Sequence, residues 1–243
     1  MVRTVTGFIL SPFFYILFGL LLLIFHPIQV IARKTGGYHA HKKSVGVLNF
    51  LLVKLLYILG CTLQFNGLEK IPADKPLIVV SNHQSIFDIQ ACVHAFDKWH
   101  PKFVSKIELA KNIPSISYNL VHGGSALIDR KSGAQSIKEI MKLGKLINEN
   151  NYAAIIYPEG TRSRSGKVKK FQSAGLKSLL RAAPRALVVP FVIKGHSELM
   201  KNGYFPLTTG VKISYTALGP IDPAGKESSE IAETCEKLIK AAL

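Results

Sequence analysis

The sequence predicts an α/β protein with a mixed, mostly parallel sheet covered by helices, preceded by a pair of membrane-associated helical segments. Three observations lead to this prediction. Short apolar runs typical of buried strands alternate with segments that carry apolar residues at helical spacing. Two longer apolar stretches lie before residue 65, and polar motifs directly follow two of the later runs. We therefore expect N-terminal membrane-anchoring helices over residues 1–65 and an α/β domain over residues 66–243.

The first apolar stretch is long enough to cross a membrane. It runs from Phe8 to Phe25 without a charged residue. Continued to Val30, it makes about 35 Å of helix, which matches the hydrocarbon core of a bilayer. The stretch is longer than the apolar core of a typical signal peptide and lacks a small-residue cleavage pattern. We therefore expect an anchor instead of a cleaved leader.

The second apolar stretch, Val45 to Leu63, is interrupted by Asn49 and Lys54. Its leucines keep helical spacing at positions 48, 52, 55 and 59. We expect this segment to lie in the membrane interface or to pack on the first segment. Two ordinary core helices are the alternative interpretation of the pair.

The remaining elements alternate along the chain. We expect strands at residues 77–80, 102–104, 125–128, 152–157, 186–193 and 211–218, and helices at residues 86–96, 133–148 and 175–181. A final amphipathic helix carries Ile231, Cys235, Leu238 and Ala242. In sheets of this kind ligands bind at the carboxyl ends of the strands, and both polar motifs begin at such ends.

The first motif, Asn82-His83-Gln84-Ser85-Ile86-Phe87-Asp88, follows the strand at 77–80. A straight helix would place His83 and Asp88 about 140° apart. The two side chains meet only if the chain turns at Gln84-Ser85 and Asp88 lies in the first turn of the next helix. Asp88 would then accept a hydrogen bond from Nδ1–H of His83 and leave Nε2 free as a general base. Alone, the pair fits a satisfied histidine at a strand end equally well.

The second motif, Tyr157-Pro158-Glu159-Gly160-Thr161-Arg162-Ser163, follows the strand at 152–157. No Asp or Glu occurs from residue 160 to 197, whereas nine Lys or Arg do, at 162, 164, 167, 169, 170, 177, 181, 185 and 194. Arginine matches phosphate oxygens, and glycine lets backbone N–H groups approach a ligand. A solvated basic loop is the alternative. The spacing of Gly160 and Gly166, with Val168 after Lys167, excludes a nucleotide-binding P-loop.

Together the motifs resemble those of the glycerolipid acyltransferase family, and most closely those of its members that acylate 1-acylglycerol 3-phosphate. The four family blocks are matched in order by His83 with Asp88, by Lys106 to Arg130, by Pro158-Glu159-Gly160-Thr161-Arg162, and by Val189-Pro190. Two positions depart from the family pattern. Ser117 stands where relatives usually have Gly, and Gln172-Ser173-Ala174-Gly175 follows Phe171 where relatives often read Phe-Lys-x-Gly.

The resemblance implies an enzyme that moves a fatty acyl group from acyl-coenzyme A or acyl carrier protein to the free hydroxyl of lysophosphatidic acid, giving phosphatidic acid. His83 would act as a general base oriented by Asp88. The expected substrate-binding residues are Glu159, Gly160, Thr161, Arg162, Arg130 and Lys106. Other acceptors, such as glycerol 3-phosphate or a lyso-lipid with an amino-acid headgroup, stay open, as does a basic membrane-anchored binding protein without catalysis.

Charge and cysteine content set the expected partners. The formal net charge of +16 suits anionic headgroups of a lipid bilayer, coenzyme A phosphates or an acidic carrier protein. Nucleic acid is not expected, because the charges follow the acyltransferase motif and no recognition helix. Cys61, Cys92 and Cys235 show no paired spacing, so neither a disulfide framework nor a zinc site is expected, and no metal or cofactor enters the prediction.

The basic connector from residue 33 to 43 predicts the membrane topology. Positive connectors tend to stay cytoplasmic. The acyl donors implied by the resemblance are also cytoplasmic, so we expect the catalytic domain at the cytoplasmic face of a membrane, as in a bacterial inner membrane. This arrangement favours at most one crossing, with the second stretch lying shallow. A re-entrant or monotopic hairpin satisfies the same constraint.

Overall fold

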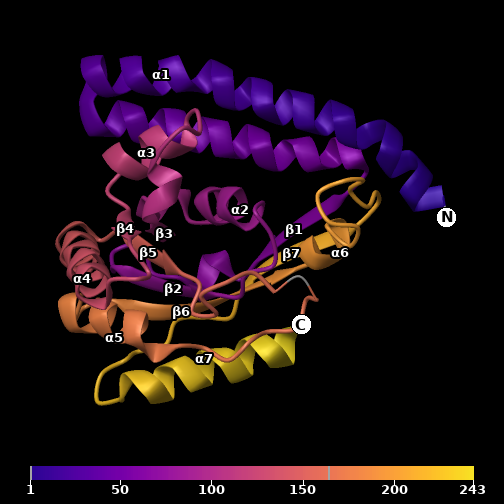
Figure 1. Cartoon of the computed structure of the whole chain (residues 1–243). Coiled ribbons are helices and arrows are strands. Elements are labelled where there is room, and N and C mark those ends of the chain that lie inside the picture. Colours follow the sequence, from indigo (N-terminus) through magenta and orange to yellow (C-terminus); the bar gives the residue numbers. More distant parts are fainter. Residues whose placement is uncertain (1, 164) are drawn as a thin grey trace.

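The computed structural model describes residues 2–163 and 165–243 and confirms the predicted fold class (Figure 1). Within this part of the chain, one mixed sheet has the strand order β1-β7-β6-β2-β5-β3-β4. The strands are β1 (Thr62–Asn66), β2 (Leu77–Ser81), β3 (Lys102–Lys106), β4 (Ala126–Ile128), β5 (Ala153–Ile156), β6 (Leu187–Lys194) and β7 (Lys212–Ala217). The α-helices are α1 (Val2–Lys54), α2 (Asp88–Ala95), α3 (Ile116–His122), α4 (Gly133–Asn150), α5 (Ser173–Ala182), α6 (His196–Leu199) and α7 (Ser228–Ala242). Short 3-10 turns occupy Leu55–Leu59, Leu68–Lys70, Asp97–Trp99 and Ile107–Ala110.

The sheet is parallel except where β6 meets β7. Strand β2 lies near its centre, between β5 and β6, and its residues are fully buried. A strand reads as a continuous apolar run when helices cover both faces of its sheet, which explains the sequence Leu-Ile-Val-Val of β2. The loops that follow β2, β5 and β6 therefore leave the sheet side by side at one carboxyl edge.

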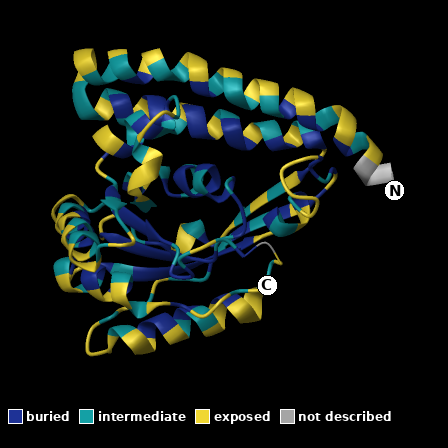
Figure 2. Ribbon diagram, in the orientation of Figure 1, coloured by how far each residue is buried: buried dark blue, intermediate teal, exposed yellow. Residues whose placement is uncertain are grey.

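Two cores lie on opposite faces of the sheet. Leu77 and Val79 of β2 face a core shared with α2 and with α1, whereas Ile78 and Val80 face a core shared with α4, α5 and α7. This division follows from the two-residue alternation of a strand. The burial colours show the same layers, with dark blue strands between helices that are yellow on their outer sides (Figure 2).

Helix α1 folds back on itself to form an antiparallel hairpin (Figure 1). The break lies at Gly37, where φ is 70° and ψ is −154°, and the arms comprise residues 2–36 and 38–54. Leu22 of the first arm packs with Leu48 and Leu52 of the second. The two expected N-terminal segments therefore form one helical pair, and the prediction that the second packs on the first is confirmed by this contact.

Several boundaries differ from those expected. The second apolar stretch stops being helical after Leu59, because Gly60 has φ of 69° and Thr62 starts to pair with β7. The expected domain boundary between residues 65 and 66 lies inside β1. The short helices α3 and α6 were not predicted, since neither is long enough to show a period.

Two expected positions of the apolar face are wrong. In α7, Leu238 and Ala242 are exposed, and the buried face consists of Ile231, Ala232, Cys235 and Ile239. This face follows the i, i+4, i+8 spacing of a helix lying against a sheet core. Ile239 therefore takes the place that the sequence interpretation assigned to Leu238.

The break at Gly37 generates a prediction about stability. Its dihedral angles lie in a region that is essentially restricted to glycine, and a side chain there costs of order 1–3 kcal/mol. We expect Gly37→Ala to lower the free energy of unfolding by about that amount, measured by chemical denaturation in detergent micelles. Gly19→Ala is the matched control, because Gly19 lies inside the first arm with open space where the new methyl group would stand, and alanine favours helix by about 1 kcal/mol. Equal effects of the two substitutions would contradict a glycine-dependent turn.

Candidate active site

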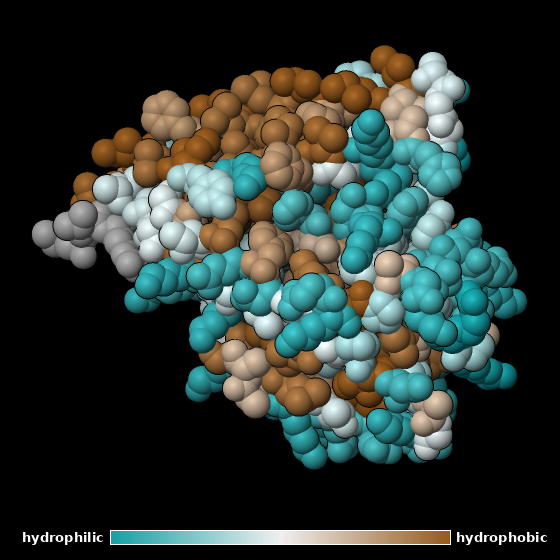
Figure 3. Space-filling model, turned by 180° about the vertical axis from the view of Figure 1, so that it is seen from behind, coloured by the Kyte–Doolittle hydropathy of each residue, from teal (hydrophilic) through white to brown (hydrophobic). Residues whose placement is uncertain are grey.

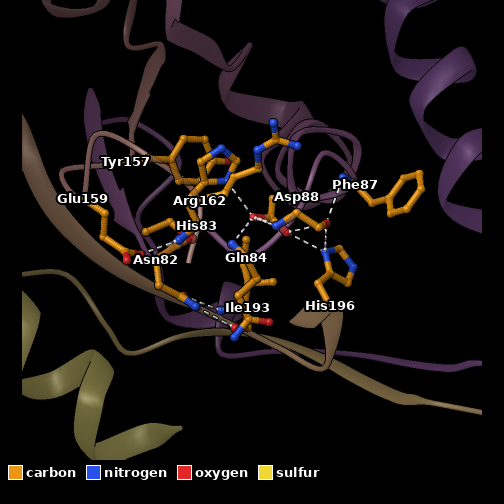
Figure 4. Close-up of polar contacts among 12 residues, drawn as sticks. Asn82, His83, Gln84, Phe87, Asp88, Tyr157, Glu159, Arg162, Ile193 and His196 are labelled. Carbon is orange, nitrogen blue, oxygen red and sulfur yellow. Dashed lines mark hydrogen bonds and ion pairs between the residues drawn. The ribbon is translucent and has the colours of Figure 1, made fainter. Parts of the chain in front are cut away.

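Three loops at the carboxyl edge of the sheet meet around His83. Strand β2 leads into His83, β5 leads into Glu159 and Arg162, and β6 leads into His196. Because β5, β2 and β6 are neighbours in the sheet, these loops lie next to one another. Figure 4 shows their side chains converging around Asp88 and the ring of His83.

His83 and Asp88 form the contact that their spacing predicts. The Nδ1 atom of His83 lies 2.7 Å from Oδ2 of Asp88, and α2 begins at Asp88. The chain turns between them, where the backbone N–H groups of Gln84 and Ser85 also donate to Oδ2, at 2.6 and 3.0 Å. Nδ1 is thereby occupied, and Nε2 of His83 has no hydrogen-bond partner among the described residues.

The Asp88 carboxylate is fully buried and surrounded by donors. Besides the three contacts at Oδ2, Oδ1 accepts from the Ser85 hydroxyl at 3.1 Å and lies 2.5 Å from Nδ1 of His196. Burial raises the pKa of this carboxyl, but the hydrogen bonds from His196 and His83 outweigh burial and hold the pKa well below its usual range. Asp88 is therefore ionised at neutral pH.

Tyr157 fixes the plane of the His83 ring. Its ring stacks on the imidazole with centroids 4.2 Å apart and an interplanar angle of 18°. The Tyr157 hydroxyl lies 3.4 Å from Sγ of Cys92, and burial raises the pKa of Tyr157 well above its ordinary value, so the phenol stays neutral. The imidazole is therefore held by Asp88 at its edge and by Tyr157 on its face.

Glu159 joins the two sequence motifs. One carboxylate oxygen accepts from the backbone N–H of His83 at 2.7 Å, and the other accepts from the backbone N–H of Lys169 at 2.9 Å. The N–H of Ser163 donates to the carbonyl oxygen of His83 at 2.7 Å. Burial raises the pKa of Glu159, and the two backbone donors partly offset this rise. Both oxygens of Glu159 thus brace the loop, and its expected role in substrate binding stays a prediction.

The rest of the second motif forms a tight basic turn. Gly160 has φ of 71°, a conformation that favours glycine. The Lys169 ammonium donates to the Thr161 hydroxyl at 2.9 Å and to the Arg162 carbonyl at 3.0 Å. The Arg162 guanidinium donates to the Tyr204 hydroxyl at 3.1 Å, and Figure 4 shows it next to the stacked rings of Tyr157 and His83.

Lys106 and Arg130 lie at the same edge but farther along it. Lys106 ends β3 and Arg130 follows β4, which are two and three strands away from β2. At ~4.8 Å between neighbouring strands, β3 is about 10 Å and β4 about 14 Å from β2, the strand that leads into His83. Both side chains are exposed. The structure does not bring them into the His83 cluster, and their substrate roles stay predictions.

The two departures from the family pattern have structural explanations. The Ser117 hydroxyl accepts from the N–H of Ile113 at 3.0 Å and donates to the carbonyl of Leu109 at 2.9 Å, so it ties down the segment before α3. Gly175 lies so close to Ile156 that a Cβ would approach its Cδ1 to 2.8 Å. This glycine lets α5 pack on β5, directly behind the second motif.

His196, Tyr157 and Tyr204 were not assigned a role from the sequence. His196 lies shortly after one predicted strand and Tyr157 is the last residue of another, and a position at a strand end was the available signal. Tyr204 lies in a loop without a periodic pattern, and no sequence feature connects it to Arg162.

Comparison with known proteins identifies the family of this chain. A model of the Acyltransferase family matches residues 62–194, which is more than half of the chain and includes every residue predicted for the site. The fold and this match define the class of protein as an α/β transferase. The chain belongs to the acyltransferase family.

Two curated relatives carry acyltransferase names, and one solved structure shares the fold. The 1-acyl-sn-glycerol-3-phosphate acyltransferase alpha of Ovis aries is 21% identical over 196 residues, covering 81% of this chain and 67% of the relative. The 1-acyl-sn-glycerol-3-phosphate acyltransferase of Saccharomyces cerevisiae is 24% identical over 210 residues, covering 86% and 67%. The crystal structure of the 1-acyl-sn-glycerophosphate (LPA) acyltransferase PlsC from Thermotoga maritima shares the fold, with a TM-score of 0.81 at 23% identity over 99% of this chain and 95% of that one.

Proposed function

We propose that this protein is a membrane-bound acyltransferase that transfers a fatty acyl group from a thioester to the free hydroxyl of lysophosphatidic acid, giving phosphatidic acid. The observation that carries the proposal is the double attachment of His83. Its ring is bonded to Asp88, and its backbone is bonded on both sides to the loop that bears Arg162. The names of the sheep, yeast and Thermotoga maritima relatives support this choice of acceptor.

The reaction needs one base and no covalent enzyme intermediate, because a thioester is already activated. Nε2 of His83 removes the proton from the acceptor hydroxyl as its oxygen attacks the thioester carbonyl carbon. The tetrahedral intermediate then expels the thiolate, which takes the proton from the His83 imidazolium. Asp88 stabilises that imidazolium, and help of this kind is worth about 10²–10⁴ in rate. Neither a metal nor a cofactor enters this sequence of steps, and acyl-coenzyme A or acyl carrier protein is the co-substrate.

Arg162 is the proposed ligand of the acceptor phosphate. Its planar guanidinium can donate two parallel hydrogen bonds to phosphate oxygens. The turn at Gly160 presents this group on the same side of the site as the His83 ring. The exposed cations Lys106 and Arg130 extend the positive edge toward β4 and suit the phosphates of the donor or the membrane. The segment 160–197 carries no acidic residue to compete for these cations.

The hairpin presents an apolar face to its surroundings. The stretch from Val5 to Leu59 is long and apolar enough to cross a membrane by length and composition, yet one side of the first arm is packed on the protein. The exposed apolar side chains of that arm follow one stripe: Val5, Phe8, Ile9, Phe13, Ile16, Leu17, Leu20, Leu23, Ile24, Ile28 and Ile31. In the view from behind, they form a continuous brown band above a largely hydrophilic body (Figure 3).

We infer from this one-sided packing that the hairpin lies within one leaflet of the bilayer. A lone helix that crosses a bilayer is surrounded by lipid, whereas Ser11, Phe14 and Gln29 of the first arm are completely buried against the rest of the protein. Phe14 contacts Phe87 with centroids 5.4 Å apart, next to the start of α2. The catalytic domain would then lie at the cytoplasmic face, as in a bacterial inner membrane, where thioester donors are available.

The loop at residues 203–209 connects this membrane face to Arg162. The Tyr15 hydroxyl donates to the carbonyl of Tyr204, and the N–H of Leu207 donates to the Ser11 hydroxyl at 2.9 Å. Phe205 packs edge-on against Phe8 with centroids 5.5 Å apart. An amphiphile whose chain stays among these apolar side chains would therefore bring its headgroup to the Arg162 turn.

The proposed reaction is tested by acyl transfer with purified protein in detergent. We expect phosphatidic acid as the product when lysophosphatidic acid is the acceptor. Glycerol 3-phosphate is tested as the competing acceptor, and each acceptor is assayed with acyl-coenzyme A and with acylated carrier protein as donor.

His83→Ala is expected to stay folded and to lose at least about a hundredfold in turnover, because it removes the base. His39→Ala, at the hairpin turn, is the control and should retain activity. Undiminished transfer by folded His83→Ala protein would reject the mechanism. If the wild-type protein makes a product other than phosphatidic acid, lysophosphatidic acid is not its acceptor.

Arg162→Ala is expected to raise the Michaelis constant for lysophosphatidic acid by about 10- to 100-fold, since a hydrogen bond to a charged group contributes ~1.5–3 kcal/mol. Arg181→Ala removes the same charge from the exposed face of α5 and serves as the matched control. Initial rates over a range of acceptor concentrations measure both. If the two variants have equal Michaelis constants, Arg162 is not the phosphate ligand.

Membrane topology gives a separate prediction. In membrane vesicles of one orientation, a cysteine in a short tag before the N-terminus and a cysteine introduced as Ser229→Cys should react with an impermeant maleimide from the same side. Cys61, Cys92 and Cys235 are buried, so their background labelling should be low. Labelling of the tag and of residue 229 from opposite sides would mean that the first arm crosses the bilayer.

A further inference from the structure

Asp88 contacts a second imidazole that the proposed mechanism does not use. His196 is completely buried, and its Nδ1 lies 2.5 Å from Oδ1 of Asp88. The two residues are 108 positions apart in the sequence and meet because β6 lies beside β2 in the sheet. His196 and its other partner, Tyr215, lie beyond the segment that the family model matches.

The local backbone is built to place His196 there. Gly195, between β6 and His196, has φ of 100°, and a Cβ at this position would approach the Lys212 carbonyl oxygen to 2.5 Å. Glycine therefore allows β6 to end against β7 and turn His196 inward. The side chain of Asn82 also joins β2 to β6, since its amide exchanges two hydrogen bonds of 2.8 Å with the backbone of Ile193.

Both ring nitrogens of His196 have hydrogen-bond partners. An ionised Asp88 only accepts, so Nδ1 of His196 carries the proton that is donated to Oδ1. Nε2 lies 2.8 Å from the Tyr215 hydroxyl, and burial raises the pKa of Tyr215 well above its ordinary value, so the phenol keeps its proton. The ring of His196 is thereby held at both nitrogens, between Asp88 and Tyr215.

The two oxygens of the Asp88 carboxylate bind different partners. Oδ2 faces His83 and the turn, whereas Oδ1 faces His196 and the Ser85 hydroxyl. Without His196, the hydroxyl of Ser85 would be the single side-chain donor left to Oδ1 among the described residues. The carboxylate plane would then be free to rotate away from the orientation that aims the His83 ring.

We propose that His196, held by Tyr215, is a positioning residue for acyl transfer, which fixes the Asp88 carboxylate and takes up part of its negative charge. The inference rests on the proposed role of His83 as the base. His196 does not touch the reacting atoms. It acts through Asp88, so that the His83 ring is held in the orientation that a base needs.

The sign of the expected pH effect follows from the charge distribution. Among the residues that the structure describes, the other titratable or charged groups around His83 and Asp88 are Tyr157, Cys92, Glu159 with Lys169, Arg162 and Tyr215. Removal of the His196 donor leaves more of the Asp88 charge to act on His83. The imidazolium form of His83 is then stabilised, and the acidic limb of the pH–rate profile moves to higher pH.

The experiment compares two substitutions at His196 with one elsewhere. His196→Leu removes the donor at similar volume, and we expect a 10- to 100-fold loss of turnover, roughly the effect of a misaimed catalytic group, with unchanged Michaelis constants. The acidic limb should rise by roughly 0.5 pH unit or more. His196→Asn places an amide N–H near the position of Nδ1 and should restore most of the turnover. His94→Leu, about 120° around α2 from Asp88 and packed on Phe50 and Phe65, should alter neither quantity.

Each outcome bears on the inference. Turnover and acidic limb like those of the wild type in folded His196→Leu protein overturn it, as does an Asn variant no better than Leu. If His196→Leu does not fold, His196→Asn and Tyr215→Phe carry the test, and wild-type pH profiles in both overturn it. Titration of the His83 ring by NMR separates this inference from the proposed function. A shifted titration in a protein without acyl transfer supports the contact and rejects the function.

Discussion

The buried carboxylate of Asp88 is the constraint on which the rest of the site depends. An ionised carboxyl without solvent is costly unless donors surround it, and here the donors come from two separate parts of the chain. The turn after β2 supplies backbone N–H groups, the Ser85 hydroxyl and the His83 ring, and α6 supplies His196. The carboxylate is therefore stable only when β2, β6 and α2 are assembled, and that assembly also aims the His83 ring.

The same coupling links the arginine turn to the histidine. Glu159 and Ser163 bond both sides of the His83 backbone, so the two motifs move as one body. Tyr157 adds a stacked ring from the start of the second motif. The backbones that carry the proposed base and the proposed phosphate ligand are in this way held together, as action on one lipid headgroup would require.

The N-terminal hairpin is part of the folded core as well as an apolar surface. Phe14 and Val53 belong to the core that also contains Val79 of β2, and Phe14 touches Phe87 next to the site. The loop at 203–209 rests on the first arm, where Gly7 lies so close that a Cβ would approach the Leu207 carbonyl oxygen to 2.3 Å. The hairpin that carries the apolar surface therefore packs directly against Phe87, the residue that precedes Asp88.

The sequence by itself determined the elements whose causes are local. The buried strand at β2, the turn at Gln84-Ser85 and the helix that begins at Asp88 follow from apolar runs and from a five-residue gap, and so does the His83–Asp88 contact. The tertiary structure alone decided the order of the strands, and with it the contacts of Asp88 with His196 and of His83 with Tyr157 and Glu159. The physical reason is that partners 74 to 108 residues apart meet through sheet pairing, which no local periodicity encodes.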